Sequence, residues 1–151
     1  MRYLLLGTLA AVIVFSNFST SYAGDHTLIA NSATIQPKKS SGADWDALNN
    51  PPDPFVIASL IVKTPDPKVK AETSVQKDTL TPKWTEKLMD VNVGDEVLIQ
   101  VWDKDILQHD LIGETKLVIT KKTIEDGELM LSFGDVKELK LTILKKTKPV
   151  K

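Results

Sequence analysis

The chain has 151 residues, with 19 basic and 20 acidic side chains, a formal net charge of −1 and no cysteine. This length suits one domain with a real hydrophobic core, and the balanced charge does not favour binding to nucleic acid. The lack of cysteine excludes disulfides, thiolate metal sites, a cysteine nucleophile and lipid attachment through an acylated cysteine.

Residues 1–23 have the organisation of a signal peptide. Arg2 supplies a short positive region, residues 3–15 are mostly apolar, and Ser21 and Ala23 are small residues at positions that a signal peptidase reads. The apolar run is shorter than the roughly 20 residues of a membrane span, although an uncleaved anchor is the competing interpretation. We therefore expect an exported protein, secreted or periplasmic, that can lie peripherally on a membrane.

Residues 24–144 contain short apolar segments that predict an all-β domain. Alternation with period two indicates half-buried strands, and short β-branched runs indicate fully buried ones. We expect eight strands, at residues 27–35, 55–62, 68–77, 85–91, 96–102, 112–120, 128–133 and 136–144. Residues 121–127 form a helical turn or a loop, and residues 145–151 a basic tail. Because half-buried strands need a second sheet to cover their apolar faces, we expect an antiparallel β-sandwich.

Two acidic loops interrupt the strand pattern, at residues 44–54 and 103–110. Carboxylates gathered without basic partners repel one another unless a cation compensates, and Ca²⁺ takes 6–8 oxygen ligands from such groups. The loops therefore indicate a calcium site, with solvated Asp-rich turns as the alternative interpretation. Their carboxylates are those of Asp44, Asp46 and Asp53, and of Asp103, Asp105 and Asp110.

Four short segments, in this order and at these separations, resemble the C2 domain family. They are Asp53-Pro54-Phe55-Val56, Thr79-Leu80-Thr81-Pro82-Lys83-Trp84-Thr85-Glu86, Val101-Trp102-Asp103-Lys104-Asp105 and Asp110-Leu111-Ile112-Gly113-Glu114. The resemblance covers roughly residues 28–144. It implies the family's type II topology, a circular permutation of type I, because one strand precedes the first acidic loop and an extra strand closes the chain.

The resemblance implies that two acidic loops meet at one end of the sandwich and hold calcium. Carried over position by position, the ligands are Asp46, Asp53, Asp103, Asp105 and Asp110, with Asp44 as the substitute for Asp46. The first loop is one residue longer than is common in the family, and the second is one residue shorter. We expect Ca²⁺ to bridge these carboxylates to the phosphates of a phospholipid membrane surface, whose oxygens fill its open positions.

Apolar residues flank both acidic loops, and bilayer interfaces favour such side chains, Trp in particular. We expect membrane insertion of these loop tips, with packing back onto the sandwich as the alternative. The tip residues are Trp45, Leu48, Ile106 and Leu107. Three lysines, Lys68, Lys70 and Lys77, lie on or beside the strand that resembles the family's basic strand, which in some members contacts anionic head groups. A solvated strand face is the simpler interpretation.

The remaining motifs do not favour catalysis, because the sequence contains no Ser/His/Asp arrangement, no Gly-rich phosphate loop and no His-x-x-x-His pair. We expect His109 to be a solvated loop residue, and Trp84 and Trp102 to be core residues. The sequence thus predicts a monomeric, non-enzymatic module that binds calcium and phospholipid. The alternative is a protein-interaction module in which calcium is structural or absent.

Overall fold

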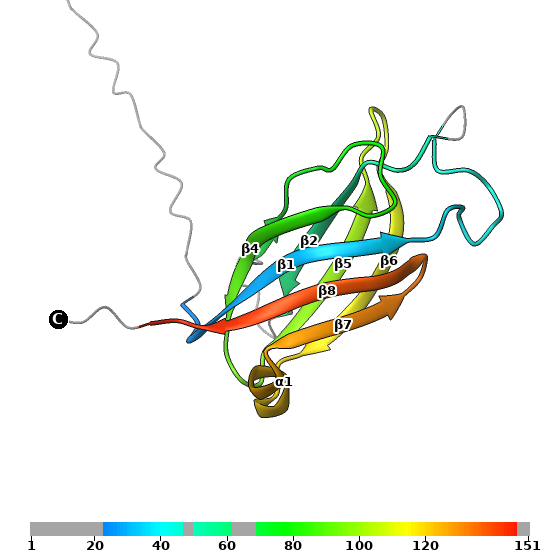
Figure 1. The fold of residues 1–151 in the computed structure, drawn as a ribbon. Coiled ribbons are helices and arrows are strands. Elements are labelled where there is room, and N and C mark those ends of the chain that lie inside the picture. The colour runs from blue at the N-terminus through cyan, green and yellow to red at the C-terminus, as the bar shows by residue number, and fades with distance from the viewer. Residues whose placement is uncertain (1–22, 47–49, 62–68, 148–151) are drawn as a thin grey trace, which may run out of the picture.

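Two four-stranded antiparallel sheets pack face to face in the computed structural model (Figure 1). The structure describes residues 23–46, 50–61 and 69–147. The strand order is β4-β1-β8-β7 in one sheet and β3-β2-β5-β6 in the other. The first acidic loop follows β1, and β8 closes the chain beside β1, as the type II order requires.

All eight expected strands are present, so the predicted β-sandwich is confirmed. They are β1 His26–Ile35, β2 Pro54–Leu60, β3 Lys70–Glu72, β4 Lys83–Val91, β5 Glu96–Asp103, β6 Asp110–Val118, β7 Glu128–Phe133 and β8 Val136–Lys145. Between β6 and β7 lies a helix, α1 Lys121–Asp126, which selects the helical alternative for that segment. The Thr120 hydroxyl caps this helix by accepting a hydrogen bond from the Thr123 N–H.

The core follows from the alternation of residues along the strands. Val97, Ile99 and Val101 of β5 are completely buried, and so are Leu139 and Leu141 of β8 in the other sheet. Side chains of a strand point alternately to the two faces, so every second apolar residue enters the space between the sheets. By the same alternation Asp103, the last residue of β5, points inward and is buried at the end of the core.

The two tryptophans expected in the core differ in position. Trp84 is buried, but Trp102 is only half-buried. Trp102 follows the inward-facing Val101, so the strand alternation directs its side chain to the outer face of the sheet. There it lies opposite Phe55 and Leu111 in the strand register.

The third expected strand, residues 68–77, is much shorter than predicted. Regular pairing with β2 covers only Lys70–Glu72. At Thr73 the backbone N–H donates to the Val56 carbonyl at 3.0 Å, but the Val56 N–H donates to the Thr73 hydroxyl, also at 3.0 Å. Because a side-chain oxygen replaces the backbone carbonyl, the ladder ends there. Residues 73–82 therefore form a loop at the end of the sandwich.

The basic tail begins as an anchored segment, because β8 extends to Lys145 and the next residue is ion-paired. The Lys146 ammonium lies 2.7 Å from a carboxylate oxygen of the buried Asp90. Lys87 contacts the same carboxylate at 2.8 Å, and the Thr27 hydroxyl donates to it at 3.1 Å. These contacts hold the pKa of Asp90 below its usual value although burial opposes them.

Close backbone packing joins β6 to the turn between β7 and β8. A Cβ atom on Gly134 would lie 2.8 Å from the Gly113 Cα, closer than real Cβ contacts. The Asp135 N–H donates to the Ile112 carbonyl at 2.9 Å across the same seam. Only glycine allows this approach, which fixes the start of β6 beside the β7–β8 turn.

Among the described residues, Asp78 and Thr85 are the two non-glycine residues with positive φ. Asp tolerates this conformation, but Thr85, at φ 78°, is β-branched and therefore strained. The strain lies at an irregularity in the β1–β4 pairing. Asn adopts positive φ more readily than Thr.

We expect Thr85→Asn to raise the free energy of unfolding by about 1 kcal/mol, because it relieves this strain. Chemical denaturation of both proteins measures the change. The control is Thr34→Asn in β1, where φ is not positive and Asn only lowers β-propensity. Equal destabilisation by both substitutions would show that Thr85 is not strained.

The expected signal peptide lies almost entirely outside the described residues. None of the helices in the part of the chain that the structure describes is long and apolar enough to span a membrane.

Candidate calcium and membrane site

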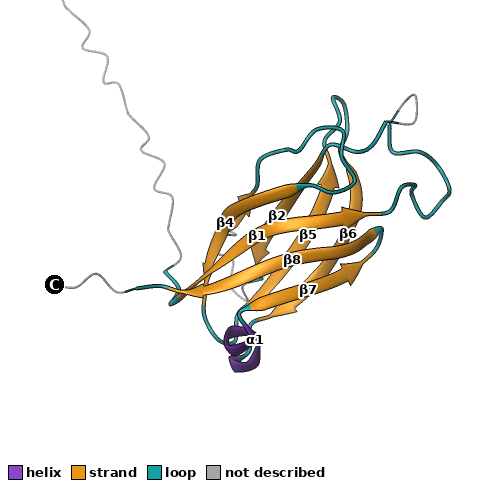
Figure 2. Cartoon of the chain, in the orientation of Figure 1, coloured by secondary structure: helices purple, strands orange, loops and turns teal. Residues whose placement is uncertain are grey.

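The acidic loops meet at one end of the sandwich. Figure 2 shows the β1–β2 connection, the β3–β4 loop and the β5–β6 loop at the same end of the two sheets. The β7–β8 turn also reaches this end, through its contact with β6. The topology therefore brings together two acidic segments that are about 50 residues apart in sequence.

Asp103 lies at the centre of this end and is completely buried. Its Oδ1 accepts a hydrogen bond of 2.6 Å from the Asp53 backbone N–H. Its Oδ2 is also buried and has no hydrogen-bond partner among the described residues. Burial raises the pKa of Asp103 from 3.8 to about 6, the Asp53 N–H lowers it, and the charges of Asp46, Asp105 and Asp53 raise it.

Asp53 connects three segments at this end. Its backbone N–H contacts Asp103, its carbonyl accepts from the Lys104 N–H at 3.0 Å, and its Oδ1 accepts from the Asp78 N–H at 2.7 Å. The start of β2, the end of β5 and the β3–β4 loop are therefore held together by one residue. Asp78 was not expected at the site, because its turn carries no run of acidic residues.

Asp46 and Asp105 face each other across the two loops. Burial raises the pKa of Asp46, and the charges of Asp105 and Asp53 and an interaction with the Asp105 side chain raise it further. Both residues are half-buried. The structure therefore brings together four of the five expected ligands: Asp46, Asp53, Asp103 and Asp105.

His109 stabilises the β5–β6 loop from within, which corrects its expected role as a solvated residue. Its Nδ1 accepts a 3.2 Å hydrogen bond from the Asp105 N–H. Its ring meets the Phe55 ring edge-on, with 5.7 Å between the centroids. The imidazole is half-buried because the loop folds back over Phe55.

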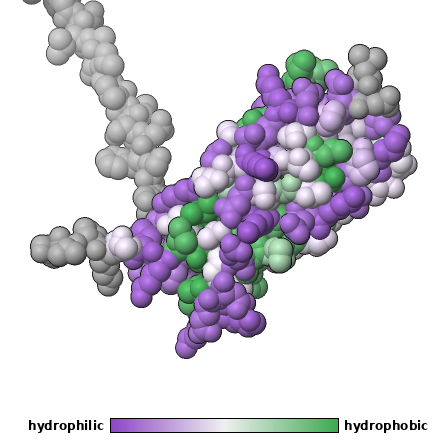
Figure 3. Space-filling view, in the orientation of Figure 1, coloured by the Kyte–Doolittle hydropathy of each residue, from purple (hydrophilic) through white to green (hydrophobic). Residues whose placement is uncertain are grey.

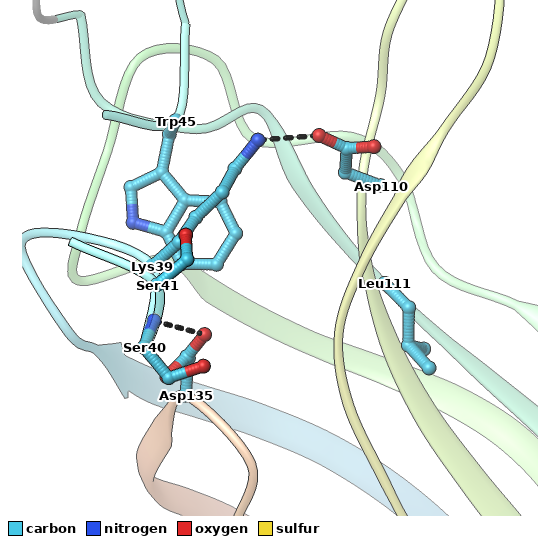
Figure 4. Close-up of a pocket in the computed structure, with 7 residues that line it drawn as sticks. All are labelled: Lys39, Ser40, Ser41, Trp45, Asp110, Leu111 and Asp135. Atoms are coloured by element: carbon cyan, nitrogen blue, oxygen red, sulfur yellow. Dashed lines mark hydrogen bonds and ion pairs between the residues drawn. The ribbon is translucent and has the colours of Figure 1, made fainter. Parts of the chain in front are cut away.

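The fifth expected ligand, Asp110, is paired with a lysine. Its Oδ2 lies 2.5 Å from the Lys39 Nζ (Figure 4). Asp44, the substitute for Asp46, contacts the Lys38 ammonium at 2.8 Å. Lys39 lies in a segment with ordinary loop composition, so nothing in the sequence pattern pointed to a cation at this site.

The described residues contain no group of three or more His, Cys, Asp or Glu side chains already arranged to hold a metal. The chemistry of the donors nevertheless fits Ca²⁺, which prefers carboxylate oxygens. A buried carboxylate oxygen without a partner is unfavourable by itself, and that of Asp103 lies in the field of three further carboxylates. Asp46, Asp53, Asp103 and Asp105 would hold the ion.

The β5–β6 loop presents two apolar side chains to solvent. Ile106 is 101% exposed and Leu107 is 98% exposed. Figure 3 shows a hydrophobic group at this tip, surrounded by a mainly hydrophilic surface. Such fully exposed apolar side chains are unfavourable in water and indicate a contact surface.

Trp45 was expected to insert into a membrane, but this expectation is wrong for the structure. Its side chain is 5% exposed, and its Nε1–H donates to the Gln36 carbonyl at 2.9 Å. The Lys39 ammonium lies 5.4 Å from the centre of its ring. The indole packs inward because the loop provides both an apolar surface and an acceptor for its N–H. Leu48 lies outside the described residues.

Two lysines of the expected basic strand, Lys70 and Lys77, do not lie on one strand face. Lys70 is exposed on β3, and Lys77 is exposed in the loop that follows it. The interruption of the ladder at Thr73 separates the two residues. Lys68 lies outside the described residues.

Comparison with known proteins agrees with this architecture. The model of the C2 domain family matches residues 31–133. No curated protein sequence matches the chain.

Solved structures similar to this chain include human GIVD cytosolic phospholipase A2 in complex with methyl gamma-linolenyl fluorophosphonate. The identity is 23% over 82% of this chain and 17% of the phospholipase, with a TM-score of 0.57. A structure described as a C2 domain is 19% identical over 81% of this chain and 97% of its own, with a TM-score of 0.58. A calcium-bound structure of the two C2 domains of Extended-Synaptotagmin 2 is 19% identical over 82% of this chain and 46% of its own, with a TM-score of 0.55.

This chain spans less than a fifth of the phospholipase, and at these identities the structural matches establish the fold alone. The family model, however, covers more than half of the chain. Its match includes the four segments that carry the resemblance. The chain therefore belongs to the C2 domain family.

Proposed function

We propose that this domain binds Ca²⁺ at its loop end and thereby associates with a phospholipid surface. The C2 family typically binds calcium and phospholipids, and the site chemistry supports the same function here. The observation that carries the proposal is the buried Oδ2 of Asp103, which lies among neighbouring carboxylates and has no partner in the described part of the chain. The exposed pair Ile106 and Leu107 lies on the same loop as two of those carboxylates, Asp103 and Asp105.

The four aspartates and the two residues of the loop tip have different roles, which follow from their positions. Asp103 and Asp53 are held by backbone hydrogen bonds at the strand ends, so they supply the fixed oxygens of the site. Asp46 and Asp105 lie on loops and close the site from two sides. A bound Ca²⁺ would neutralise the carboxylates and offer its open positions to lipid phosphate oxygens. Ile106 and Leu107 then bury apolar surface in the bilayer interface.

We expect Ile106→Asp and Leu107→Asp each to reduce calcium-dependent binding to phospholipid vesicles at least tenfold. Full burial of such a side chain contributes roughly 1.5–3 kcal/mol, and every 1.4 kcal/mol is about tenfold in affinity. Co-sedimentation with vesicles of mixed anionic and zwitterionic phospholipid, in calcium and in EDTA, measures the loss. The control is Val93→Asp, which places the same charge on an exposed apolar residue in the β4–β5 turn at the other end of the sandwich.

Calcium binding in solution separates this function from the alternative of a protein-interaction module. Bound calcium without vesicle binding would favour a protein partner with calcium in a structural role. Equal losses in the Val93 variant would assign the effect to general charge repulsion, and the loop tip would then have no special part in membrane association.

We also propose that the domain acts after export, because residues 1–23 have the organisation of a signal peptide. Extracellular calcium modules bind in the range of about 10⁻⁴–10⁻³ M, which suits a compartment rich in calcium. Amino-terminal sequencing of the mature protein tests the cleavage, and a mature chain that begins at Gly24 is the expected result.

A further inference from the structure

Lys39 places a positive charge inside the acidic loop end. Its Nζ lies 2.5 Å from the Asp110 Oδ2 and 5.4 Å from the centre of the Trp45 ring (Figure 4). The side chain is only 25% exposed. This contact differs from an ordinary surface pair, because the ammonium is partly withdrawn from water and has an aromatic face on one side.

The backbone around Lys39 holds it in this position. The Lys39 N–H donates to the Ala43 carbonyl at 2.9 Å and closes a turn. The next N–H, that of Ser40, donates to the Asp135 Oδ2 at 3.1 Å. The Asp135 N–H in turn bonds to the Ile112 carbonyl of β6 at 2.9 Å. Lys39 is therefore tied, through the β7–β8 turn, to the strand that begins at its ion-pair partner.

The ammonium also lies in the field of the other ligands. The hydrogen bond to Asp110 raises the pKa of Lys39 above its usual value, burial opposes that rise, and the charges of Asp110, Asp103 and Asp105 add to it. The carboxylates that would attract Ca²⁺ therefore already attract Lys39. One side chain supplies part of the charge that the ion would otherwise provide.

We propose that Lys39 is a tethered counter-cation that competes with Ca²⁺ for Asp110 and so sets the calcium affinity of the loops. This inference rests on the proposed calcium site and adds to it a residue that determines affinity. In the calcium-free domain Lys39 keeps Asp110 out of the ligand group. Asp110 would have to leave the ammonium before it could join the residues that hold the ion.

The displaced ammonium has a second possible partner nearby. A cavity of about 270 Å³ adjoins the Lys39–Asp110 pair. Its lining includes Ser41 and Asp135, and Figure 4 shows Asp135 on the side of Lys39 away from Asp110. Asp135 is therefore a second carboxylate toward which the displaced ammonium can turn.

Calcium titration of the full-length protein by calorimetry tests the proposal, with Lys39→Gln and Lys38→Gln as matched variants. Each removes one positive charge from the same loop, but Lys38 is 59% exposed and pairs with Asp44 at 2.8 Å. We expect Lys39→Gln to tighten Ca²⁺ binding about tenfold, because the competing cation is gone. Lys38→Gln should change affinity less than about twofold, since only a screened long-range effect is removed.

A double-mutant cycle with Asp110→Asn completes the test. In the Asp110→Asn background, Lys39→Gln should tighten calcium binding less than about threefold, because the ligand for which Lys39 competes is absent. Equal effects of the two lysine substitutions would overturn direct competition and leave the calcium site intact. Calcium binding by Lys39→Gln but not by the wild type would also support the proposal, because the lysine would then exclude the ion completely. Absence of calcium binding in every protein would overturn both this proposal and the proposed function.

Discussion

Replacing Asp103 with Asn should raise the melting temperature of the calcium-free protein and, at the same time, abolish the rise that calcium produces in the wild type. The two effects have one cause. Without calcium, the buried carboxylate of Asp103, whose pKa is about 6, should carry its charge at pH 7.5 among three other carboxylates, and one of its oxygens has no partner among the described residues. The amide of Asn carries no charge, so it removes the repulsion but also removes a calcium ligand.

The expected sizes follow from linkage. A pKa raised from 3.8 to about 6 corresponds to a destabilisation of the order of 3 kcal/mol at pH 7.5, which Asn removes in part. In the wild type, Ca²⁺ at 100 times its dissociation constant should add about 2.7 kcal/mol to the native state. Each change shifts the melting temperature by several degrees in a domain of this size. Thermal melting in EDTA, calcium and magnesium at matched ionic strength measures both.

The matched control is Asp126→Asn. Asp126 is paired with Lys122 at 2.9 Å on α1, away from the acidic loops. This variant should keep the full calcium response. A wild-type protein that melts at the same temperature with and without calcium would contradict the proposed site. An Asp103 variant that is less stable in EDTA would show that the carboxylate has a partner in solution.

The second large effect concerns pH. The stability of the calcium-free protein should fall as the pH rises from about 4 to above 6. The native state keeps the proton of Asp103 up to about pH 6, whereas the unfolded chain releases it near pH 3.8. In this window the native state binds more protons than the unfolded state, so the free energy of unfolding decreases as the pH increases. Calcium should oppose this decrease, because it binds the ionised carboxylate.

Chemical denaturation between pH 4 and pH 8 measures this dependence, and Asp103→Asn should flatten it. Asp90 provides an internal contrast. Its pKa is lowered in the native state by Lys146, Lys87 and Thr27. Asp90 therefore adds to the free energy of unfolding above its unfolded pKa, and this added stability is lost as the pH falls below about 4. A wild-type stability that rises steadily from pH 4 to pH 7 would contradict the assignment to Asp103.

The sequence predicted most of the fold because strand alternation is a local property. Residues such as Val97, Ile99 and Val101 identify β5 by their period, and the turn signals separate the strands. The prediction failed at β3, where the Thr73 hydroxyl takes the place of a backbone carbonyl. A single side-chain hydrogen bond of this kind leaves no trace in the hydrophobic pattern.

The candidate site could be predicted only in part, for the same physical reason. Asp103 and Asp53 were identifiable because they stand at strand ends within recognisable motifs, and the structure joins them by a 2.6 Å hydrogen bond. The direction of a loop side chain depends on contacts with distant segments. Trp45 therefore points inward, against the expectation, because its indole contacts the Gln36 carbonyl and Lys39.

By itself the sequence determined the strand pattern, the family resemblance and the aspartates that ring one end of the domain. Only the tertiary structure decided how those aspartates are used. It buries Asp103, brings Asp46 close to Asp105 and pairs Asp110 with Lys39. Composition and spacing define which charges are present, but burial and distance set their energies, and both depend on how segments far apart in the chain fold together.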